Sequence, residues 1–383
     1  MYNVGLIGLG MSGIRFIRAL NYLHKRDYSF SLVGVYDRNQ DNYDLLKDDV
    51  KTYNSLSEFM EKDNYDMVIV SANEEAHYEI LMNLKKNLKH CKKYIVEKPL
   101  VSNSTELTEI SSIFENSEII VNYVERNSQI IEMVKNYIQS NNLDIIRMHF
   151  LWGKCRLYDS RPTIGASSEI VHPLDLCFYL LNTYNNDEIN IVQGNYIKSD
   201  YSVSGSDILD TIDIAMLVKN EIIISGSSSF LWSNRKREIS FYLQPNDKSI
   251  DVKYIIHMYF DSPRWDIDGY IICKIKSNGE REEVLSYTTS NSDDNETVCI
   301  NKIIKFLRNV EKELEQNIII DELHHLEQSY CIQKIMDDIN NSSTYLSNHI
   351  FQCNNENNRY NNIREYIKSV KDENYNSILD TGY

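Results

Sequence analysis

Two residues of this chain stand in settings suited to proton transfer, and the first is Lys98. It lies in the segment Val96-Glu97-Lys98-Pro99-Leu100, which begins at the end of a short apolar run. Ligands bind at the carboxyl ends of parallel strands, so a lysine at such an end faces a ligand rather than bulk solvent. Burial lowers the pKa of a lysine and helps it to exchange a proton with a substrate hydroxyl. The alternative is a surface lysine before a loop proline.

The second residue is His172, which lies among apolar residues in the segment Gly165–Leu176. Glu169 and Asp175 stand three positions on either side of it. Residues three apart lie near one face of a helix, so a carboxylate there can orient the imidazole for general acid–base catalysis. A histidine satisfied within the core is the alternative interpretation.

A glycine-rich turn near the start of the chain predicts a nucleotide site. Gly8-Leu9-Gly10-Met11-Ser12-Gly13 has the G-x-G-x-x-G spacing, in which the glycines allow a tight turn, close approach of a pyrophosphate, and close packing of helix on strand. Asp37 follows the next predicted strand, 24 positions after Gly13. A carboxylate there binds the ribose hydroxyls and favours NAD. Arg38 would instead suit the 2′-phosphate of NADP, so both cofactors stay open.

The elements that must position these residues fall into two patterns. Up to Asn122 strands and helices alternate, which predicts a doubly wound parallel sheet, that is, a Rossmann domain. Strands are expected at 3–8, 30–36, 66–71, 93–96 and 118–122, with helices at 12–25, 77–88 and 104–114 and a polar helical stretch after Tyr36.

Past Asn122 the pattern changes to a second domain. Helices are expected at 128–139 and 169–181, a strand at 144–152, strand-like runs between 190 and 287, and amphipathic helices at 301–316 and 322–339. This predicts an α+β domain with a large, mostly antiparallel open sheet. The expected domains are 1–123, 124–350 and a polar C-terminal tail, 351–383.

The composition excludes several classes of partner. The chain has 40 Lys and Arg against 56 Asp and Glu, a net charge of −16, so neither a nucleic acid nor an anionic membrane surface is expected. No apolar run approaches the roughly 18 residues of a membrane span. Seven scattered cysteines with no CxxC pair predict reduced thiols and a cytoplasmic protein. His324 and His325 are adjacent and have no Cys/His cluster around them, so no metal site is expected.

The order of these motifs resembles that of the Gfo/Idh/MocA family of NAD(P)-dependent oxidoreductases. The resemblance is carried by GLGMSG at 8–13, VYDRN at 35–39, SANEEAH at 71–77, VEKPL at 96–100, NYVERN at 122–127 and SEIVHPLDL at 168–176. It implies a Rossmann domain followed by a domain whose open sheet often forms a dimer or tetramer interface. A homodimer or homotetramer is therefore expected.

The resemblance also implies roles for individual residues. Lys98 would contact the reacting hydroxyl or carbonyl, Glu97 would position the nicotinamide end, and His172 would be the general acid/base. Hydride would pass between nicotinamide and a secondary alcohol or ketone of a sugar, sugar phosphate, nucleotide sugar or cyclitol. The expected cofactor-binding residues are Gly8, Gly10, Met11, Ser12, Gly13, Asp37, Arg38, Ser71, His77, Glu97 and Lys98.

Residues expected near the substrate come from three segments. NYVERN resembles a subgroup pattern of enzymes acting on nucleotide-linked amino sugars, which places Glu125 and Arg126 near the cleft. The run WGKCRLYDSRP at 152–162 is dense in cations and aromatics and suits a phosphate or carboxylate, although a solvated loop is an equal alternative. The expected substrate-binding residues are Arg126, Lys154, Tyr158, Arg161, Ser168, Glu169 and Asp175.

One departure from the family pattern affects the proton relay. The family commonly has Asp four residues before the histidine, and here that position is Ser168. Glu169 is rotated from it by about 100° on a helix, so it is no obvious substitute. Two other functions stay open: a reductase of imines or other non-sugar substrates, and a non-catalytic, dinucleotide-sensing regulator. The Ser168 departure favours the regulator, whereas retention of Lys98 and His172 opposes it.

Overall fold

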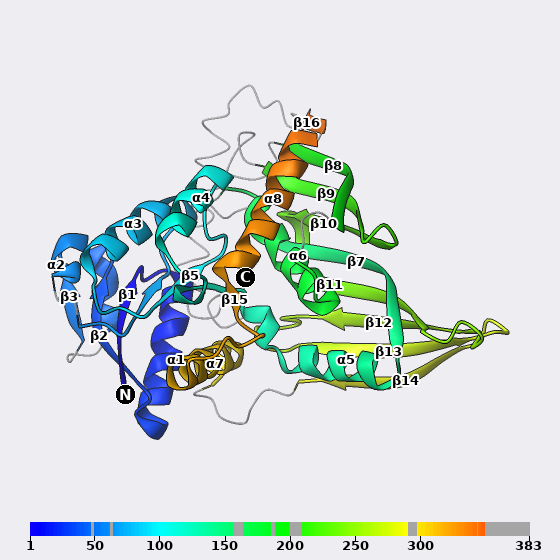
Figure 1. Cartoon of the computed structure of the whole chain (residues 1–383), viewed down its shortest axis with the longest axis horizontal. Coiled ribbons are helices and arrows are strands. Elements are labelled where there is room, and N and C mark those ends of the chain that lie inside the picture. The colour runs from blue at the N-terminus through cyan, green and yellow to red at the C-terminus, as the bar shows by residue number, and fades with distance from the viewer. Residues whose placement is uncertain are drawn as a thin grey trace. The chain divides into compact units, whose positions relative to one another are not determined.

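The structure is a computed structural model in which the chain divides into two compact units (Figure 1). Unit 1 consists of Met1–Asn127 and Ser292–Lys334, and unit 2 of Ser128–Asn291 and Ile335–Tyr383. The structure describes residues 1–46, 50–61, 64–156, 164–184, 188–199, 209–289, 297–342 and 344–348. The expected polar tail, 351–383, lies outside the described residues.

Unit 1 is built on a seven-stranded sheet in the order β15-β6-β5-β4-β1-β2-β3. The strands are β1 (Tyr2–Ile7), β2 (Phe30–Tyr36), β3 (Lys51–Tyr53), β4 (Met67–Val70), β5 (Lys93–Glu97), β6 (Ile119–Asn122) and β15 (His324–His325). Neighbours run parallel except at the edge, where β15 pairs antiparallel with β6. The order of β1 to β6 is that of a dinucleotide-binding doubly wound sheet, so the predicted Rossmann architecture is confirmed.

Helix α1 follows the glycine turn directly. Its apolar side chains recur at helical spacing, and Phe16, Ile17, Leu20 and Leu23 are buried against the sheet. The helix ends at Asp27 because Tyr28 takes a left-handed conformation, with φ 57°, and donates its N–H to the His24 carbonyl. The helices of unit 1 are α1 (Met11–Asp27), α2 (Leu56–Met60), α3 (His77–Asn87), α4 (Ser104–Ile113) and α7 (Asn301–Gln316).

Helix α7 belongs to unit 1, which differs from the domain division expected from the sequence. Its side chains Phe306, Leu307 and Val310 are buried in the same core as Phe16 and Leu20 of α1. The rings of Phe16 and Phe306 lie 6.4 Å apart, edge to face. The chain therefore returns to its first unit, and a linear boundary at residue 123 misses this return because amphipathic spacing does not identify the partner of an apolar face.

The sequence also did not predict the two short strands β3 and β15. The polar stretch after Tyr36 forms a 3-10 helix, Gln40–Leu45, followed by β3. The helix expected from residue 322 begins only at Leu326 as α8 (Leu326–Ser342), because His324 and His325 pair with β6. Strands of two or three residues are too short to show an alternating pattern.

Unit 2 is built on a nine-stranded sheet in the order β14-β13-β12-β11-β7-β10-β9-β8-β16. The pairs β7–β10 and β8–β16 are parallel and the other pairs are antiparallel, so the predicted large, mostly antiparallel sheet is confirmed. The strands are β7 (Leu143–Cys155), β8 (Ile189–Ser199), β9 (Leu209–Val218), β10 (Ile222–Ser229), β11 (Leu231–Pro245), β12 (Val252–Tyr259), β13 (Gly269–Lys276), β14 (Arg281–Thr288) and β16 (Thr344–Asn348).

The two faces of this sheet differ. Helices α5 (Gln129–Ser140) and α6 (Ser167–Leu181) pack on β7, and α6 also reaches β9 and β10 (Figure 1). Side chains along β11 alternate between buried and half-buried positions, as expected for a sheet covered on one side. We define the open face as the side carrying Leu217, Ile223, Tyr242, Ile255 and Ile271. No helix among the described residues is both long and apolar enough to span a membrane.

The assignment of α7 to unit 1 predicts the effect of truncating its central side chain. Phe306→Ala should lower the free energy of unfolding by about 3–5 kcal/mol, because it removes a ring from a filled core. The matched control is Ile319→Ala, whose side chain is 60% exposed and should cost little. Urea denaturation checks both variants, and equal stabilities would contradict the assignment.

Candidate functional site

The glycine turn of unit 1 has the geometry of a nucleotide cradle. Gly8 has φ +95°, and a Cβ there would lie 2.6 Å from the Ser71 backbone. A Cβ on Gly13 would collide with the Gly8 carbonyl oxygen. A Cβ on Gly10 would meet nothing within 4 Å, so the missing side chain leaves open space above the turn. This space lies at the N-terminus of α1, whose N-cap residue is Gly10. The helix N–H groups and the open turn fit a pyrophosphate.

Buried polar atoms at the strand ends also fit a dinucleotide. Ser71 follows β4, and Asn122 ends β6. In the part of the chain that the structure describes, Ser71 Oγ and Asn122 Oδ1 are buried and have no hydrogen-bond partner. Buried polar atoms are normally satisfied, and leaving one unpaired costs about 1–3 kcal/mol. Both atoms lie at the carboxyl ends of the parallel strands, which is where such folds bind their ligands.

The Asp37 carboxylate is held firmly after β2. Its Oδ2 accepts the N–H of Leu9, and its Oδ1 accepts the N–H of Asn39 at 2.6 Å. The first bond holds the Asp37 carboxylate next to the glycine turn. This is where a group that binds the ribose hydroxyls of the cofactor is expected. Arg38 is exposed.

The Glu97 carboxylate joins the glycine turn to two strands. Its Oε1 accepts hydrogen bonds from Ser12 Oγ and from Asn122 Nδ2, the latter at 2.7 Å. Asn122 is the register partner of Glu97 in the β5–β6 pair. The Ser12 hydroxyl therefore binds Glu97, and this bond helps to fix the position of Glu97 directly before Lys98. Asn122 was not among the predicted site residues, because register between strands is not visible in the sequence.

His77 fixes the backbone that follows Lys98. The ring is fully buried, with Nδ1 2.9 Å from the Pro99 carbonyl oxygen and Nε2 3.2 Å from that of Ala72. Burial lowers the pKa of this histidine, against the opposing effect of the two carbonyl groups. The neutral ring donates to only one of the two carbonyls. His77 thus ties the segment after β4 to the segment after β5, where Lys98 is half-buried.

Arg126 lies in a buried cluster of unit 1 together with the adjacent histidines. Its guanidinium lies 3.1 Å from the Leu323 carbonyl oxygen and from Gln328 Oε1, and 2.9 Å from His324 Nδ1. These contacts tie the NYVERN segment to β15 and account for the burial of Arg126 within unit 1.

His325 points to a different partner from His324. Its Nε2 is 2.9 Å from Glu313 Oε1, and Lys93 Nζ is 3.4 Å from the same oxygen. The two histidine rings therefore diverge, as their adjacency predicts. No group of three or more metal-ligating side chains is found among the described residues.

His172 lies in α6 of unit 2, packed against an aromatic ring. Its imidazole stacks on the Trp152 indole, with centroids 5.9 Å apart and planes inclined by 26°. Both side chains are buried. Trp152 comes from β7, on which α6 packs.

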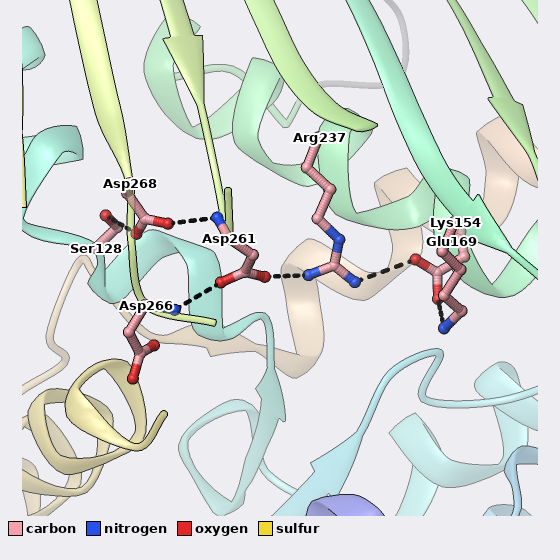
Figure 2. Close-up of polar contacts among 7 residues, drawn as sticks. All are labelled: Ser128, Lys154, Glu169, Arg237, Asp261, Asp266 and Asp268. Carbon is pink, nitrogen blue, oxygen red and sulfur yellow. Dashed lines mark hydrogen bonds and ion pairs between the residues drawn. The ribbon is translucent and has the colours of Figure 1, made fainter. Parts of the chain in front are cut away.

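Glu169 belongs to a chain of charged side chains that continues through Arg237 to Asp261 (Figure 2). Lys154 Nζ lies 2.6 Å from its Oε1, and Arg237 Nη2 lies 3.3 Å from its Oε2. Arg237 Nη1 lies 2.5 Å from Asp261 Oδ2. The side chains of Arg237, Glu169 and Asp261 are 3%, 2% and 0% exposed, so each buried charge is compensated inside the protein. Two residues predicted to bind substrate, Lys154 and Glu169, therefore pair with each other.

The network continues beyond Asp261 into the loop that follows β12. Asp261 Oδ1 accepts the N–H of Asp266 at 3.0 Å, and the N–H of Asp261 donates to Asp268 Oδ1 at 2.8 Å (Figure 2). Ser128 Oγ donates to Asp268 Oδ2 at 2.5 Å. These bonds fix the loop that supplies the second carboxylate to Arg237. Neither Arg237 nor Asp261 was predicted, although Arg237 stands two positions before the alternating apolar residues Ile239 and Phe241 of β11, a spacing that indicates a buried cation.

The remaining predicted residues of unit 2 have local partners or lie outside the described residues. Ser168 Oγ donates to the Gly165 carbonyl oxygen at 2.9 Å in the first turn of α6. Asp175 Oδ1 accepts a hydrogen bond from the Tyr184 hydroxyl at 3.2 Å. Tyr158 and Arg161 belong to the segment 157–163, outside the described residues.

Comparison with protein families decides the class of unit 1. Residues 2–124 match the model of an oxidoreductase family with an NAD-binding Rossmann fold, Gfo/Idh/MocA. This N-terminal domain belongs to that family. The chain is thus an NAD(P)-dependent oxidoreductase, and the open turn at Gly10 fits that cofactor, as does the buried Ser71 Oγ, which has no hydrogen-bond partner within the described ranges. Which of NAD and NADP it prefers is a separate question. A search of curated proteins finds no match.

Solved structures resemble the whole chain in fold. KijD10 from Actinomadura kijaniata, a 3-ketoreductase in complex with NADP and TDP-benzene, has a TM-score of 0.69 at 11% identity over 91% of this chain and 99% of its own. GnnA from Acidithiobacillus ferrooxidans, a UDP-N-acetylglucosamine 3-dehydrogenase, has 0.65 at 12%, over 89% and 97%. MviM from Clostridium difficile, a dehydrogenase, has 0.64 at 17%, over 89% and 99%. At these identities the likeness is one of fold.

The buried His77 ring predicts a pH dependence of stability. Its folded pKa is lowered, so below the unfolded value of 6.5 the unfolded chain takes up a proton that the folded ring does not. This contribution to stability is fully present above pH 6.5 and is lost as the pH falls toward the folded pKa. His77→Gln should therefore cost about 1–3 kcal/mol near pH 7.5, with a smaller difference at pH 5.5.

Urea denaturation of the wild type and the variant at both pH values measures this change. The exposed His90, as His90→Gln, is the matched control. A stability difference between wild type and His77→Gln that is the same at both pH values would contradict the prediction.

Proposed function

We propose that this enzyme transfers a hydride between nicotinamide and a secondary alcohol or ketone of a sugar, with a nucleotide-linked sugar as the favoured substrate. The observation that carries the proposal is the Glu97 carboxylate, which joins the glycine turn to the strand end that precedes Lys98. Two proteins of similar fold support the substrate class, since one is a 3-ketoreductase crystallised with TDP-benzene and the other a UDP-N-acetylglucosamine 3-dehydrogenase.

We infer NAD as the preferred cofactor. The Asp37 carboxylate is tied to the glycine turn through Leu9 and is available to ribose hydroxyls, and the same negative charge disfavours a 2′-phosphate. KijD10 carries NADP in its crystals, so NADP is the alternative. When bound, the nicotinamide accepts or supplies the hydride.

Lys98 acts on the substrate oxygen in this proposal. An ammonium group donates a hydrogen bond to a hydroxyl or carbonyl oxygen and stabilises negative charge that develops there. The backbone on both sides of Lys98 is fixed, by Glu97 through its bonds to Ser12 and Asn122, and by Pro99 through its bond to His77. Such anchoring reduces the freedom that the lysine loses when substrate binds.

His172 acts as the general acid/base. In the oxidative direction it removes the hydroxyl proton as the C–H bond breaks, and in the reductive direction it returns that proton to the carbonyl oxygen. Trp152 packs against the ring and limits its rotation. Because Ser168 Oγ donates to the Gly165 carbonyl oxygen and Glu169 is paired with Lys154 and Arg237, no relay through residue 168 or 169 is included in the proposal.

Removing either functional group should abolish turnover without unfolding the protein. Lys98→Met and His172→Asn should each lower kcat by at least about 100-fold, the usual contribution of a positioned acid/base or charge-stabilising group. NADH formation with a panel of UDP- and TDP-sugars measures the loss.

Matched controls are Lys92→Met, whose side chain is 61% exposed, and His90→Asn, whose side chain is also exposed. Both should keep wild-type rates. Near-native turnover of Lys98→Met and His172→Asn would overturn the assignment of the site.

We also propose that the enzyme is a cytoplasmic homodimer or homotetramer that associates through the open face. All six cysteines among the described residues are free thiols, as expected in a reducing compartment. Ile223 is 47% exposed on this face and pairs with the half-buried Leu217, and Tyr242, Ile255 and Ile271 are half-buried on strands farther along the sheet. An apolar sheet face of this kind is commonly covered by a partner.

A charge placed on the open face should separate the subunits. Ile223→Asp is expected to give a monomer in light scattering, because a carboxylate in an apolar interface loses its hydration without gaining a partner. The control Ile319→Asp alters an exposed apolar residue of unit 1 and should leave the assembly intact. A monomeric wild type, or an oligomeric Ile223→Asp variant, would contradict this interface.

A further inference from the structure

The amide side chain of Asn122, at the carboxyl end of β6, uses only one of its two polar atoms. Asn122 is 4% exposed, and its Nδ2 donates a hydrogen bond of 2.7 Å to Glu97 Oε1. Its Oδ1 is buried and has no hydrogen-bond partner in the part of the chain that the structure describes. Buried acceptors in folded proteins are nearly always hydrogen-bonded, so this oxygen is suited to a donor that a ligand supplies.

The orientation of the Asn122 amide follows from the chemistry of Glu97. Glu97 is the register partner of Asn122 in the β5–β6 pair, and its Oε1 also accepts the Ser12 hydroxyl. An ionised carboxylate only accepts hydrogen bonds, so the NH2 group of Asn122 must face Glu97. A flipped amide would bring two acceptor oxygens together. Glu97 therefore holds Asn122 in the orientation that leaves Oδ1 as an acceptor.

The end of the β5–β6 pair reaches the solvent beside Asn122. Glu97 and Lys98, which follow one another at the end of β5, are both half-buried. The bond from Ser12 connects the same strand end to the glycine turn, where the pyrophosphate of a dinucleotide is expected. A ligand that extends from the turn toward Lys98 thus passes the pair formed by Glu97 and Asn122.

The other buried oxygen without a partner in the described ranges of this strand edge, Ser71 Oγ, lies at a different part of the nucleotide site. It is 3.6 Å from the position that a Cβ on Gly13 would take, and so it lies next to the glycine turn. Ser71 follows β4, whereas Asn122 ends β6, and β5 lies between the two strands. The position of Ser71 suits the pyrophosphate end of a cofactor, and that of Asn122 suits the end near Lys98.

The donors that a dinucleotide can offer differ along its length. At the nicotinamide end the ring has no N–H group of its own, and its carboxamide has two. An amide N–H is the usual partner of an amide oxygen such as Asn122 Oδ1. Because NAD and NADP have the same carboxamide, this pairing does not depend on which of them is bound.

We propose that Asn122 Oδ1 accepts an N–H of the nicotinamide carboxamide and so fixes the rotation of the nicotinamide ring about its bond to the ribose. This inference rests on the proposed function in one respect, since it takes Lys98 to lie at the reacting end of the cofactor. Asn122 is then a cofactor-binding residue, and Glu97 is a positioning residue that acts through the Asn122 amide. The fixed rotation presents one face of the ring to the substrate.

Binding of a cofactor analogue tests this inference without sugar and without turnover. 3-Acetylpyridine adenine dinucleotide has a methyl group in place of the carboxamide NH2 and is otherwise identical to NAD. Isothermal titration calorimetry on the full chain measures the Kd of each dinucleotide, or of the phosphorylated pair if the chain prefers NADP. The wild type should bind NAD about tenfold or more tightly than the analogue, the size expected when a buried acceptor loses its donor.

Variants then assign this preference to Asn122. Asn122→Leu should weaken NAD and bring the two Kd values within about twofold of each other, and Asn122→Ala should do the same with a smaller side chain. Ser71→Ala is the matched control, because it also removes a buried oxygen of the nucleotide site. It should weaken both dinucleotides by the same factor and leave their ratio at the wild-type value.

Three results would overturn the inference: no binding of either dinucleotide by the wild type, equal Kd values for the two in the wild type, or a wild-type ratio retained by the Asn122 variants. The comparison within the wild type depends on no substitution, so poor folding of one variant does not remove the test. Failure of every sugar nucleotide to be turned over would instead overturn the proposed function and would leave these Kd values unchanged.

Discussion

A guanidinium group that is buried away from water needs carboxylate partners. In unit 2 the buried Arg237 has two such partners, and the segments that supply them are fixed by this pairing. The charge lies between Glu169 of α6 and Asp261 of the loop after β12, and Arg237 itself belongs to β11. Leaving a buried charge unpaired costs about 3–5 kcal/mol, so the three segments are held in one arrangement. His172 follows Glu169 by three residues on the same helix, where its ring stacks on Trp152.

In unit 1 a smaller set of polar contacts has the same role. The Glu97 carboxylate collects donors from the glycine turn and from β6, and His77 connects the next backbone carbonyl to the segment after β4. Each bond joins different strand ends, so the position of Lys98 follows from several segments rather than from its own loop. The two units are thus similar in this respect. In each, a charged side chain with several partners, Arg237 or Glu97, lies near a residue that is proposed to be catalytic, His172 or Lys98.

Much of the fold followed from the sequence, because long periodic segments carry their own signal. The parallel sheet, the glycine turn with Asp37 behind it and the antiparallel sheet were all predictable from spacing and alternation. The return of α7 to unit 1 was not, since Phe306 is apolar in either environment. Within the site, Lys154 and Glu169 were expected to face substrate, yet they form an ion pair at 2.6 Å. Asn122, Arg237 and Asp261 were missed because their importance comes from strand register and loop position.

Deuterium transfer measured by mass spectrometry tests the proposed activity most directly. The enzyme is given NADH or NADPH that carries deuterium at nicotinamide C4, on one face in one reaction and on the other face in a second reaction, together with the keto form of a UDP-sugar. The expected result is one deuterium per molecule of sugar product, bound to the carbinol carbon, in one of the two reactions and none in the other. A sugar product without deuterium in both reactions, or no reduction of any keto sugar nucleotide by protein that binds the cofactor, would contradict the proposal.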